Sequence, residues 1–326
     1  MGIKISPNIA LVTTPTRLSG LLAKYGTRGS AKFQMGSSRK RFAVAVEMDL
    51  DDAGAFAAYD AEDAHYQSAV AGVRADLEGL GYPVINVPRD RLATFYFEMT
   101  EAVVVVGPDG LVANAAKYAH DRPIIGINPD PENIDGVLLP FGLGDVRRVT
   151  RRSLAGKQAT ERVTLGRVDL SDGQRLLAFN DFYLGRRTHV SARYLIYDGP
   201  RHERQSSSGV IVSTGAGSTG WLRSVYQMAG GIIGGDPRRS PTHPPPLART
   251  ERKLRYVVRE PFPSRTTGTA LITGEIEPDR PLRVESQMPE GGVIFSDGVE
   301  ADAIDFPAGV IAEFGIADQT CELAVA

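Results

Sequence analysis

Short apolar runs separated by turn residues dominate the first 140 residues. Four of these runs have the length and β-branched content of strands: Asn8–Thr14, Tyr82–Val87, Ala102–Val106 and Pro123–Ile127. The third reads AVVVV, which is typical of a strand buried on both faces of a parallel sheet. Helical spacing of alanine and other apolar residues predicts helices between strands, at Asp51–Leu80 and Leu111–Ala119. The stretch Gly26–Arg41 has no period and is predicted to be a surface loop.

From about Pro140 the pattern changes to short alternating segments with turn residues between them. Strands are predicted at Val163–Leu170, Arg175–Leu184, Ala192–Tyr197 and Gly209–Ser213, and again from Lys253 to the end. One helix is expected within this region, at Ser218–Ala229. The pattern therefore predicts an α/β protein with a Rossmann-like parallel-sheet domain over 1–142 and a β-rich domain over 143–326.

Composition narrows the class of protein. The chain has 326 residues, and its 37 basic and 39 acidic residues leave a formal charge of −2, so nucleic acid is not an expected partner. The single cysteine, Cys321, excludes an internal disulfide framework and fits a reducing compartment. Neither a signal peptide nor a membrane-spanning stretch is evident. We therefore expect a cytoplasmic protein.

The first candidate for chemistry is the turn GPDG at 107–110, which follows the AVVVV strand and precedes a helix. Backbone N–H groups and the positive end of a helix dipole suit a phosphate there. Asp109 would repel that phosphate unless its carboxylate bound Mg²⁺ or accepted a proton. The alternative is a plain type I turn, since Pro-Asp-Gly is a common turn sequence.

Two further segments are candidates. The run STGAGSTGW at 213–221 joins an apolar strand to a helix, and its hydroxyls and glycines suit a nucleotide's phosphates or ribose. Trp221 adds a large apolar surface, although a helix N-cap with a core tryptophan is the alternative. Asn180 and Asp181 interrupt the strand-like LLAFNDFYLG, which indicates either a site or a bulge.

Together, in this order, the three segments resemble the NAD kinase family. GPDG resembles the family's GGDG loop, Asn180-Asp181 its Asn-Glu pair, and the segment from Ser208 to Thr219 its Gly-Ser-Thr-Ala-Tyr-like run. The likeness is greatest to the branch that includes the mitochondrial enzymes of animals. It extends over most of the chain, through VTTPTRL, IIGINPDPENIDGVLLPF, VVREPFPSR and the late turn Ser296-Asp297-Gly298.

The resemblance implies transfer of the ATP γ-phosphoryl to the 2′-hydroxyl of the adenosine ribose of NAD, with NAD held between the domains. It implies that the last strands pack back on the N-terminal domain and that the protein is a homodimer or larger homo-oligomer. Asp109 would be the catalytic carboxylate and would help to hold Mg²⁺. The implied NAD-binding residues are Gly110, Asn180, Asp181, Ser191, Ser208, Ala216, Thr219, Gly220 and Trp221. The implied phosphate-binding residues are Gly107, Thr214, Gly217 and Ser218.

Four positions depart from the family pattern. Pro108 replaces a glycine and so lacks one N–H donor, and Asp181 replaces the longer glutamate. Ser208 stands where many members have an acidic residue, and Gly220-Trp221 replaces Ala-Tyr. Two alternatives to an NAD kinase therefore stay open: a kinase of another small hydroxyl acceptor, and a catalytically impaired nucleotide-binding protein.

Overall fold

The structure is a computed structural model that describes residues 8–36, 52–234 and 245–326, with side chains in the first long helix from Phe56 onward. The described chain divides into two compact units. Unit 1 comprises the residues up to Val112 together with Ile125–Gln158, and unit 2 comprises Ala113–Ile124 and Ala159–Val325. The functional domain boundary expected at 142 stays a prediction.

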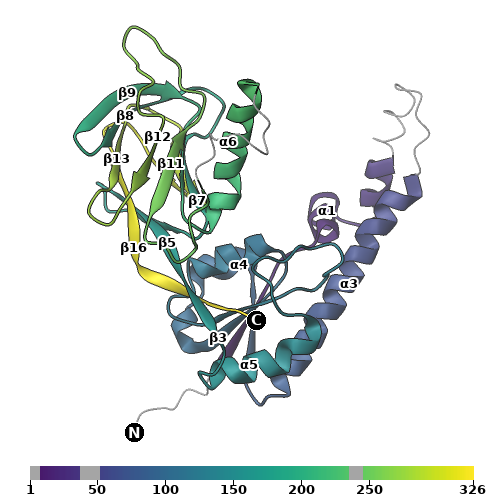
Figure 1. Ribbon diagram of the computed structural model, residues 1–326. Helices are drawn as coiled ribbons and strands as arrows, with labels where there is room; N and C mark the ends of the chain where they lie inside the picture. The colour runs from purple at the N-terminus through teal and green to yellow at the C-terminus, as the bar shows by residue number, and fades with distance from the viewer. Residues whose placement is uncertain (1–7, 37–51, 235–244) are drawn as a thin grey trace. The chain divides into compact units, whose positions relative to one another are not determined.

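A small sheet forms the centre of unit 1 (Figure 1). Its strand order is β2 (Val84–Pro88), β1 (Asn8–Thr13), β3 (Thr100–Val106) and β4 (Ile124–Ile127). β1 is parallel to both β2 and β3, with Val12 opposite Val87 and Val105. All four strands were predicted from their apolar runs, which are buried on both faces in β1, β3 and β4 and only partly buried in β2. The chain runs from β1 outward to β2, but from β3 outward to β4, so the switch point of this sheet lies between β1 and β3.

Helices alternate with these strands along the chain. They are α1 (Arg17–Tyr25), α3 (Asp52–Glu78), α4 (Asp109–Ala116) and α5 (Val146–Leu154), with 3-10 turns at Arg89–Thr94, Phe97–Met99 and Leu143–Asp145. The long helix at 51–80 was predicted correctly. α5 was missed, although its buried residues Val146, Val149 and Thr150 and its four arginines lie on opposite faces at helical spacing. The prediction of a loop at 26–41 is also wrong over its described part, since residues 28–36 are helical. Residues 37–41 lie outside the described residues.

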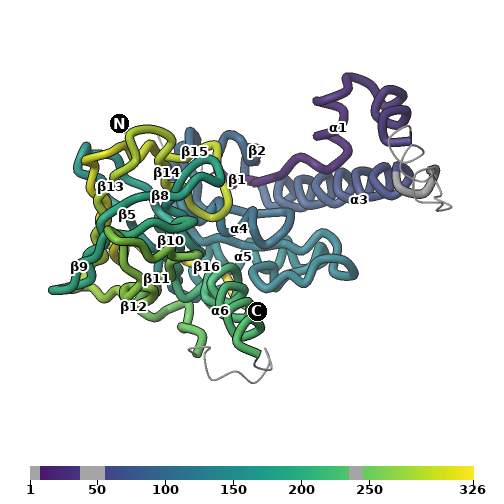
Figure 2. Tube along the Cα trace, turned by 90° about the horizontal axis from the view of Figure 1, so that it is seen from above, coloured from purple at the N-terminus to yellow at the C-terminus, as the bar shows by residue number. Residues whose placement is uncertain are grey.

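The helical residues 28–36 have a reason to be ordered. Ala31 is fully buried in an apolar cluster with Leu18 of α1 and Phe56 of α3. Figure 2 shows α1 and these residues beside the N-terminal part of α3. A partner surface on α3 therefore overrides the weak helical signal of a segment rich in glycine, serine and lysine.

Unit 2 is a sandwich of two antiparallel sheets. One contains β16 (Ile311–Ala324), β13 (Leu282–Ser286), β8 (Ala192–Asp198) and β9 (Arg201–Ser207), with β5 (Thr160–Leu170) beside β16 and β6 (Arg175–Ala178) beside β5. The other has the order β12 (Thr273–Ile276), β11 (Leu254–Val258), β10 (Val210–Ser213), β7 (Asp181–Arg186), β14 (Gly292–Ser296) and β15 (Val299–Asp305). Phe182 and Phe314, one from each sheet, meet edge to face at 5.5 Å.

The helix of unit 2 is α6 (Trp221–Ile232), preceded by a 3-10 turn at Gly217–Thr219. Figure 1 shows α6 alongside β7 and β11, and its Leu222 is buried against Ile211 and Val257. Two sequence predictions need correction here. The helix expected from Ser218 begins at Trp221, since Gly220 has the non-helical angles φ −96° and ψ −118°. The strand expected at 175–184 is two strands, broken at Phe179 and Asn180.

The outer edge of β9 is covered by the loop that precedes β12. Phe262 donates its N–H to the carbonyl of Ser206 at 2.8 Å, and Gly268 donates to that of Arg204 at 3.0 Å. The carboxylate of Glu203 accepts the N–H groups of Ala270 and Leu271, each at 3.0 Å. This loop is therefore hydrogen-bonded to β9 much as a neighbouring strand would be.

Two expectations about the whole chain concern membranes and cysteine chemistry. Within the described residues, no helix is both long and apolar enough to span a membrane. Cys321 is buried in β16, as expected for a small apolar residue, and burial raises the pKa of its thiol to about 12.

Candidate functional site

The switch point of unit 1 is held together by one tyrosine. The hydroxyl of Tyr66, on α3, accepts the N–H of Thr14 at 2.9 Å and donates to the carbonyl of Val106 at 2.8 Å. It thereby joins the ends of β1 and β3. Gly107 follows at φ 155°, where an added Cβ would lie 2.9 Å from a methyl carbon of Leu111. The turn after β3 thus requires glycine at its first position.

Asp109 lies in the first turn of α4 and is partly exposed. Its Oδ1 accepts the N–H of Leu138 at 2.6 Å, and its Oδ2 has no hydrogen bond to any described residue. Leu138 reaches it because Gly126 has no side chain: a Cβ there would lie 2.1 Å from the carbonyl oxygen of Leu138. The neighbours Pro108 and Gly110 are exposed. One oxygen of Asp109 is therefore fixed and the other is free to meet a ligand.

In unit 2 the break between β6 and β7 is capped by a carboxylate. Asp297, at φ 53° in the turn between β14 and β15, accepts the N–H groups of Phe179, Asn180 and Asp181 at 3.0, 2.6 and 3.3 Å. The residue as a whole is partly exposed, because its backbone forms the turn, whereas its carboxylate is enclosed. Three backbone donors explain why the chain breaks into a tight turn at this point.

Asp181 is the residue of this turn whose carboxylate has no protein partner. It is 8% exposed, and its carboxylate has no hydrogen-bond partner among the described residues. Burial, with a smaller contribution from the charge of Asp297, raises the pKa of Asp181 to about 7. Burial also raises the pKa of Asp297, although its backbone donors and a nearby lysine hold it to about 6. A buried carboxylate without a partner is typical of a binding site.

The segment 213–221 packs directly against the Asn180 turn. Thr214 donates its N–H to the carbonyl of Asn180 at 2.8 Å, and its hydroxyl donates to that of Phe179 at 2.5 Å. Gly217 is pressed against the same turn, where an added Cβ would lie 2.1 Å from the oxygen of Asn180. Two of the three sequence motifs therefore form one structure within unit 2.

The polar groups of this segment divide into internal and accessible ones. Thr214 and Ser218 are buried, and the hydroxyl of Ser218 donates to the carbonyl of Gly215 at 2.7 Å. Thr219 and Gly220 are exposed, and Ala216 is partly exposed. The buried hydroxyls of Thr214 and Ser218 already donate to backbone carbonyls. The contacts of these residues with NAD and phosphate remain predictions.

Trp221 forms part of an aromatic cluster. Its ring stacks on Tyr183 at 5.9 Å, and the guanidinium of Arg259 lies 5.6 Å from the indole. The hydroxyl of Tyr183 donates to the carbonyl of Ser208 at 3.2 Å, which connects the exposed Ser208 to this cluster. Ser191 is also exposed and, with Ser208, flanks the cross-strand pair Ala192 and Ser207.

Sequence reasoning missed three functional candidates. Tyr66 had no signal, since a tyrosine in a helical pattern indicates packing. Asp297 belongs to a turn that was noted, but its role as a cap depends on a contact 117 residues away. Lys117 could have been found, because a lysine that directly follows the apolar LVANAA is out of place on a buried helix.

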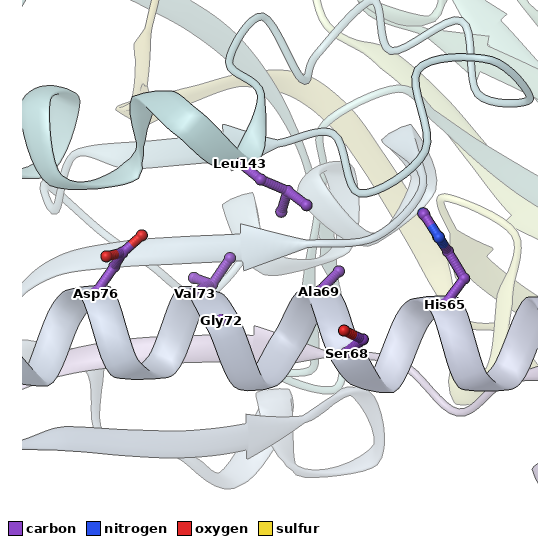
Figure 3. A pocket seen from close by; sticks show the side chains of 7 residues that line it. All are labelled: His65, Ser68, Ala69, Gly72, Val73, Asp76 and Leu143. Atoms are coloured by element: carbon purple, nitrogen blue, oxygen red, sulfur yellow. The ribbon is translucent and has the colours of Figure 1, made fainter.

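A shallow cavity of about 160 Å³ lies elsewhere in unit 1. Figure 3 shows it between one face of α3 and Leu143, lined also by His65, Ser68, Ala69, Gly72, Val73 and Asp76. It contains none of the predicted site residues. His65 is tied to the carbonyl of Pro129 at 2.8 Å, which gives the histidine a structural role.

The fold belongs to a known class. It is similar to a solved NAD kinase from Archaeoglobus fulgidus in complex with ATP, with a TM-score of 0.55, 20% identity, and coverage of 78% of this chain and 88% of that one. It is also similar to yeast NADH kinase complexed with NADH, with a TM-score of 0.56, 12% identity, and coverage of 98% and 84%. The expected NAD kinase-like α/β fold is confirmed.

Comparison of the sequence with curated proteins also finds NAD kinases. The chain is 29% identical to the mitochondrial NAD kinase 2 of Rattus norvegicus over 40% of this chain and 41% of the relative, and 33% identical to the NAD kinase of Acinetobacter baylyi over 41% and 44%. It thus matches less than half the length of these curated relatives. No protein-family model matches the chain. The predicted resemblance to NAD kinases, including the mitochondrial type, is confirmed.

Proposed function

We propose that this protein is an NAD kinase that uses ATP to phosphorylate the 2′-hydroxyl of the adenosine ribose of NAD. The named relatives and the fold support an enzyme of this kind. Within unit 2, the proposed NAD-binding residues Asn180, Asp181, Ala216 and Thr219 belong to two segments that pack against each other. We assign Ser191, Ser208, Gly220 and Trp221 to the same nucleotide.

The buried carboxylate of Asp181 is the observation that carries this proposal. The residue is 8% exposed, no hydrogen bond from another described residue reaches its carboxylate, and burial disfavours the charged form of that carboxylate. NAD supplies hydroxyl and amide donors that could satisfy it. A purely structural aspartate would instead be hydrogen-bonded within the fold, as Asp297 is.

Asp109 is the proposed catalytic group. Its Oδ1 is fixed by Leu138, and its free Oδ2 can orient or deprotonate the attacking hydroxyl. Gly110 is assigned to NAD, and Gly107, Thr214, Gly217 and Ser218 are assigned to the phosphates.

Mg²⁺ would be held by Asp109 and the phosphates of ATP. The described residues contain no group of three or more acidic, histidine or cysteine side chains that could hold a metal by itself. A single free carboxylate oxygen still fits Mg²⁺, which commonly binds one or two carboxylates together with substrate phosphates and water. When bound, the ion would neutralise charge on the transferred phosphoryl group.

The direct test is NADP formation. Purified protein with NAD, ATP and Mg²⁺ should produce NADP and ADP in equal amounts, and omission of NAD should abolish ADP release. Other small alcohols in place of NAD test the alternative acceptor class. ADP release with such an alcohol but not with NAD would reject the proposal.

The second candidate function is nucleotide binding without catalysis, and Pro108 favours it. Proline removes one N–H donor from the exposed turn that faces the proposed phosphates. If this weakens ATP binding, Pro108→Gly should strengthen it or raise kcat, by about 1.5 to 3 kcal/mol at most. Steady-state kinetics with varied ATP would measure the effect. Lower activity in Pro108→Gly would show that the turn is adapted to proline.

We also propose that the protein works in the cytoplasm as a homodimer or larger homo-oligomer. The single buried cysteine fits a reducing compartment and supports the first part, and the family resemblance supports the second. Light scattering of the purified chain would give the oligomeric state.

A further inference from the structure

Lys117 is a buried cation that the proposed mechanism does not use. The residue is 4% exposed and directly follows α4. Its Nζ donates to Ser296 Oγ at 3.0 Å and to Asp302 Oδ2 at 2.9 Å. The hydroxyl of Tyr118 donates to the same Asp302 oxygen at 2.6 Å. A lysine is rarely enclosed in this way unless its charge is needed.

The ammonium group lies behind the turn that carries Asn180 and Asp181. Ser296, one of its two partners, is the residue before Asp297, and Asp297 caps that turn through three N–H groups. All of these residues belong to unit 2. The positive charge of Lys117 is also close enough to Asp297 to lower the pKa of its carboxyl against the effect of burial.

The charges around Asp297 are unbalanced without Lys117. Asp181 faces Asp297 from β7, and Lys117 and Tyr118 face Asp297 from the end of α4. Asp302 lies on β15, the strand that follows the turn of Asp297. Lys117 therefore compensates two carboxylates, those of Asp297 and Asp302, while Asp181 adds a third negative charge beside Asp297. One oxygen of Asp302 is buried and without a hydrogen bond, so the negative charge here is only partly compensated.

We propose that Lys117 is a positioning residue of the nucleotide site: its ammonium group keeps the Asp297 cap ionised and so holds Asn180 and Asp181 where NAD reaches them. An ionised cap accepts all three N–H groups, whereas a protonated one binds them weakly. The inference rests on the proposed function only for the identity of the ligand. The effect on the cap is a property of the unliganded protein.

The test uses three variants. Lys117→Met removes the charge at similar length, and Lys117→Arg keeps it. Lys117→Met combined with Asp302→Asn removes both members of the buried ion pair, which protects folding if Lys117→Met alone leaves an unpaired carboxylate. Thermal unfolding identifies which variants are folded. Every variant is made in the full-length chain.

The first readout needs no nucleotide. The backbone amides of Phe179 and Asn180 donate to Asp297, so their ¹⁵N chemical shifts report its ionisation during a pH titration. We expect the midpoint to rise by about one pH unit in Lys117→Met and in the double variant, and to stay unchanged in Lys117→Arg. A wild-type midpoint in a folded double variant would overturn the proposal, because Lys117 would then act only as the partner of Asp302.

The second readout links the cap to function. NAD affinity, measured by calorimetry between pH 5 and 8, should begin to fall at a higher pH in the double variant than in wild type. An unchanged pH profile would also overturn the inference. If the wild-type protein binds no NAD, the proposed function fails instead, and the amide titration still decides the role of Lys117.

Discussion

At the scale of single residues, two carboxylates at the break between β6 and β7 have different tasks. Asp297 is satisfied by three backbone donors, whereas Asp181 has no partner among the described residues. The first therefore shapes the turn, and the second is available to a ligand. The same distinction holds for Asp109, where one oxygen is fixed by Leu138 and the other is free.

Replacing Asp109 with asparagine tests its chemistry. The amide oxygen of Asn can still accept the Leu138 N–H, so the fold and NAD affinity should survive. Loss of the general base should lower kcat by about 10² to 10⁴, with little change in the affinity for NAD. Asp90→Asn, at an exposed aspartate of the same unit, is the control. Near-normal turnover in folded Asp109→Asn would remove Asp109 from the mechanism.

Asp181→Asn should have opposite effects on stability and binding. Because the pKa of Asp181 is raised from 3.8 to about 7 in the folded state, its ionisation lowers stability progressively as pH rises from about 4 to 7. Asn removes this cost, so the unliganded variant should be more stable at pH 8 by on the order of 3 kcal/mol, and no more stable at pH 4.

Urea unfolding at both pH values would measure this difference, and calorimetry should show weaker NAD binding. A variant that loses stability at pH 8 would mean that Asp181 supports the fold rather than the ligand. Asp130→Asn is a suitable comparison, since Asp130 belongs to a loop outside the proposed site.

The candidate residues differ in how readily sequence reveals them. Asp109 lies in a turn with two glycines directly after an apolar strand, and Asn180-Asp181 interrupt a strand-like apolar segment, so both stand out locally. The roles of Asp297 and Lys117 depend on partners 117 and 179 residues away along the chain. No local pattern encodes such contacts, so only the folded unit shows them.

At the scale of elements, the glycines of the 213–217 segment serve close packing. Gly215 leaves room for the carbonyl of Ala248, 2.0 Å from its ideal Cβ position, and Gly217 leaves room for that of Asn180. From the sequence, these glycines were predicted to let a nucleotide's phosphates or ribose approach the backbone. Close contact between backbone segments by itself already requires glycine at both positions.

Gly217→Ala should therefore disturb the site through its framework. Its Cβ would lie 2.1 Å from the Asn180 oxygen, so the two segments must separate, at a cost of about 1 to 3 kcal/mol or more. NAD affinity should fall as the turn moves. Gly231→Ala in α6, where an added Cβ meets nothing within 4 Å, should raise stability slightly and leave binding unchanged. Equal stability of the two variants would contradict this packing argument.

Strands and helices were predictable where apolar period was strong. The four strands of unit 1 and α3 follow their patterns closely. The pattern failed at 175–184, where Asp297 imposes a turn on a strand-like sequence, and at 28–36, where packing against α3 orders a helix in a segment predicted to be a loop. In both cases tertiary contacts outweighed local preference.

At the scale of the whole molecule, the proposed NAD contacts are concentrated in unit 2, with only Gly110 in unit 1. NAD at about 100 times its Kd should therefore stabilise the folded protein by about 2.7 kcal/mol. Hydrogen exchange should show this protection mainly at the amides of 179–181 and 213–221. Protection confined to unit 1, or none at saturating NAD, would place the nucleotide elsewhere.

The loop over β9 has a consequence for self-association. An open strand edge invites another chain to add a strand, and repeated addition leads to aggregation. Here the carbonyls of Arg204 and Ser206 are already occupied, and Glu203 anchors the loop that occupies them. Copies of this protein must therefore associate through side chains or through other strand edges. Loss of the Glu203 anchor would uncover the edge of β9, where a strand of another copy could then add.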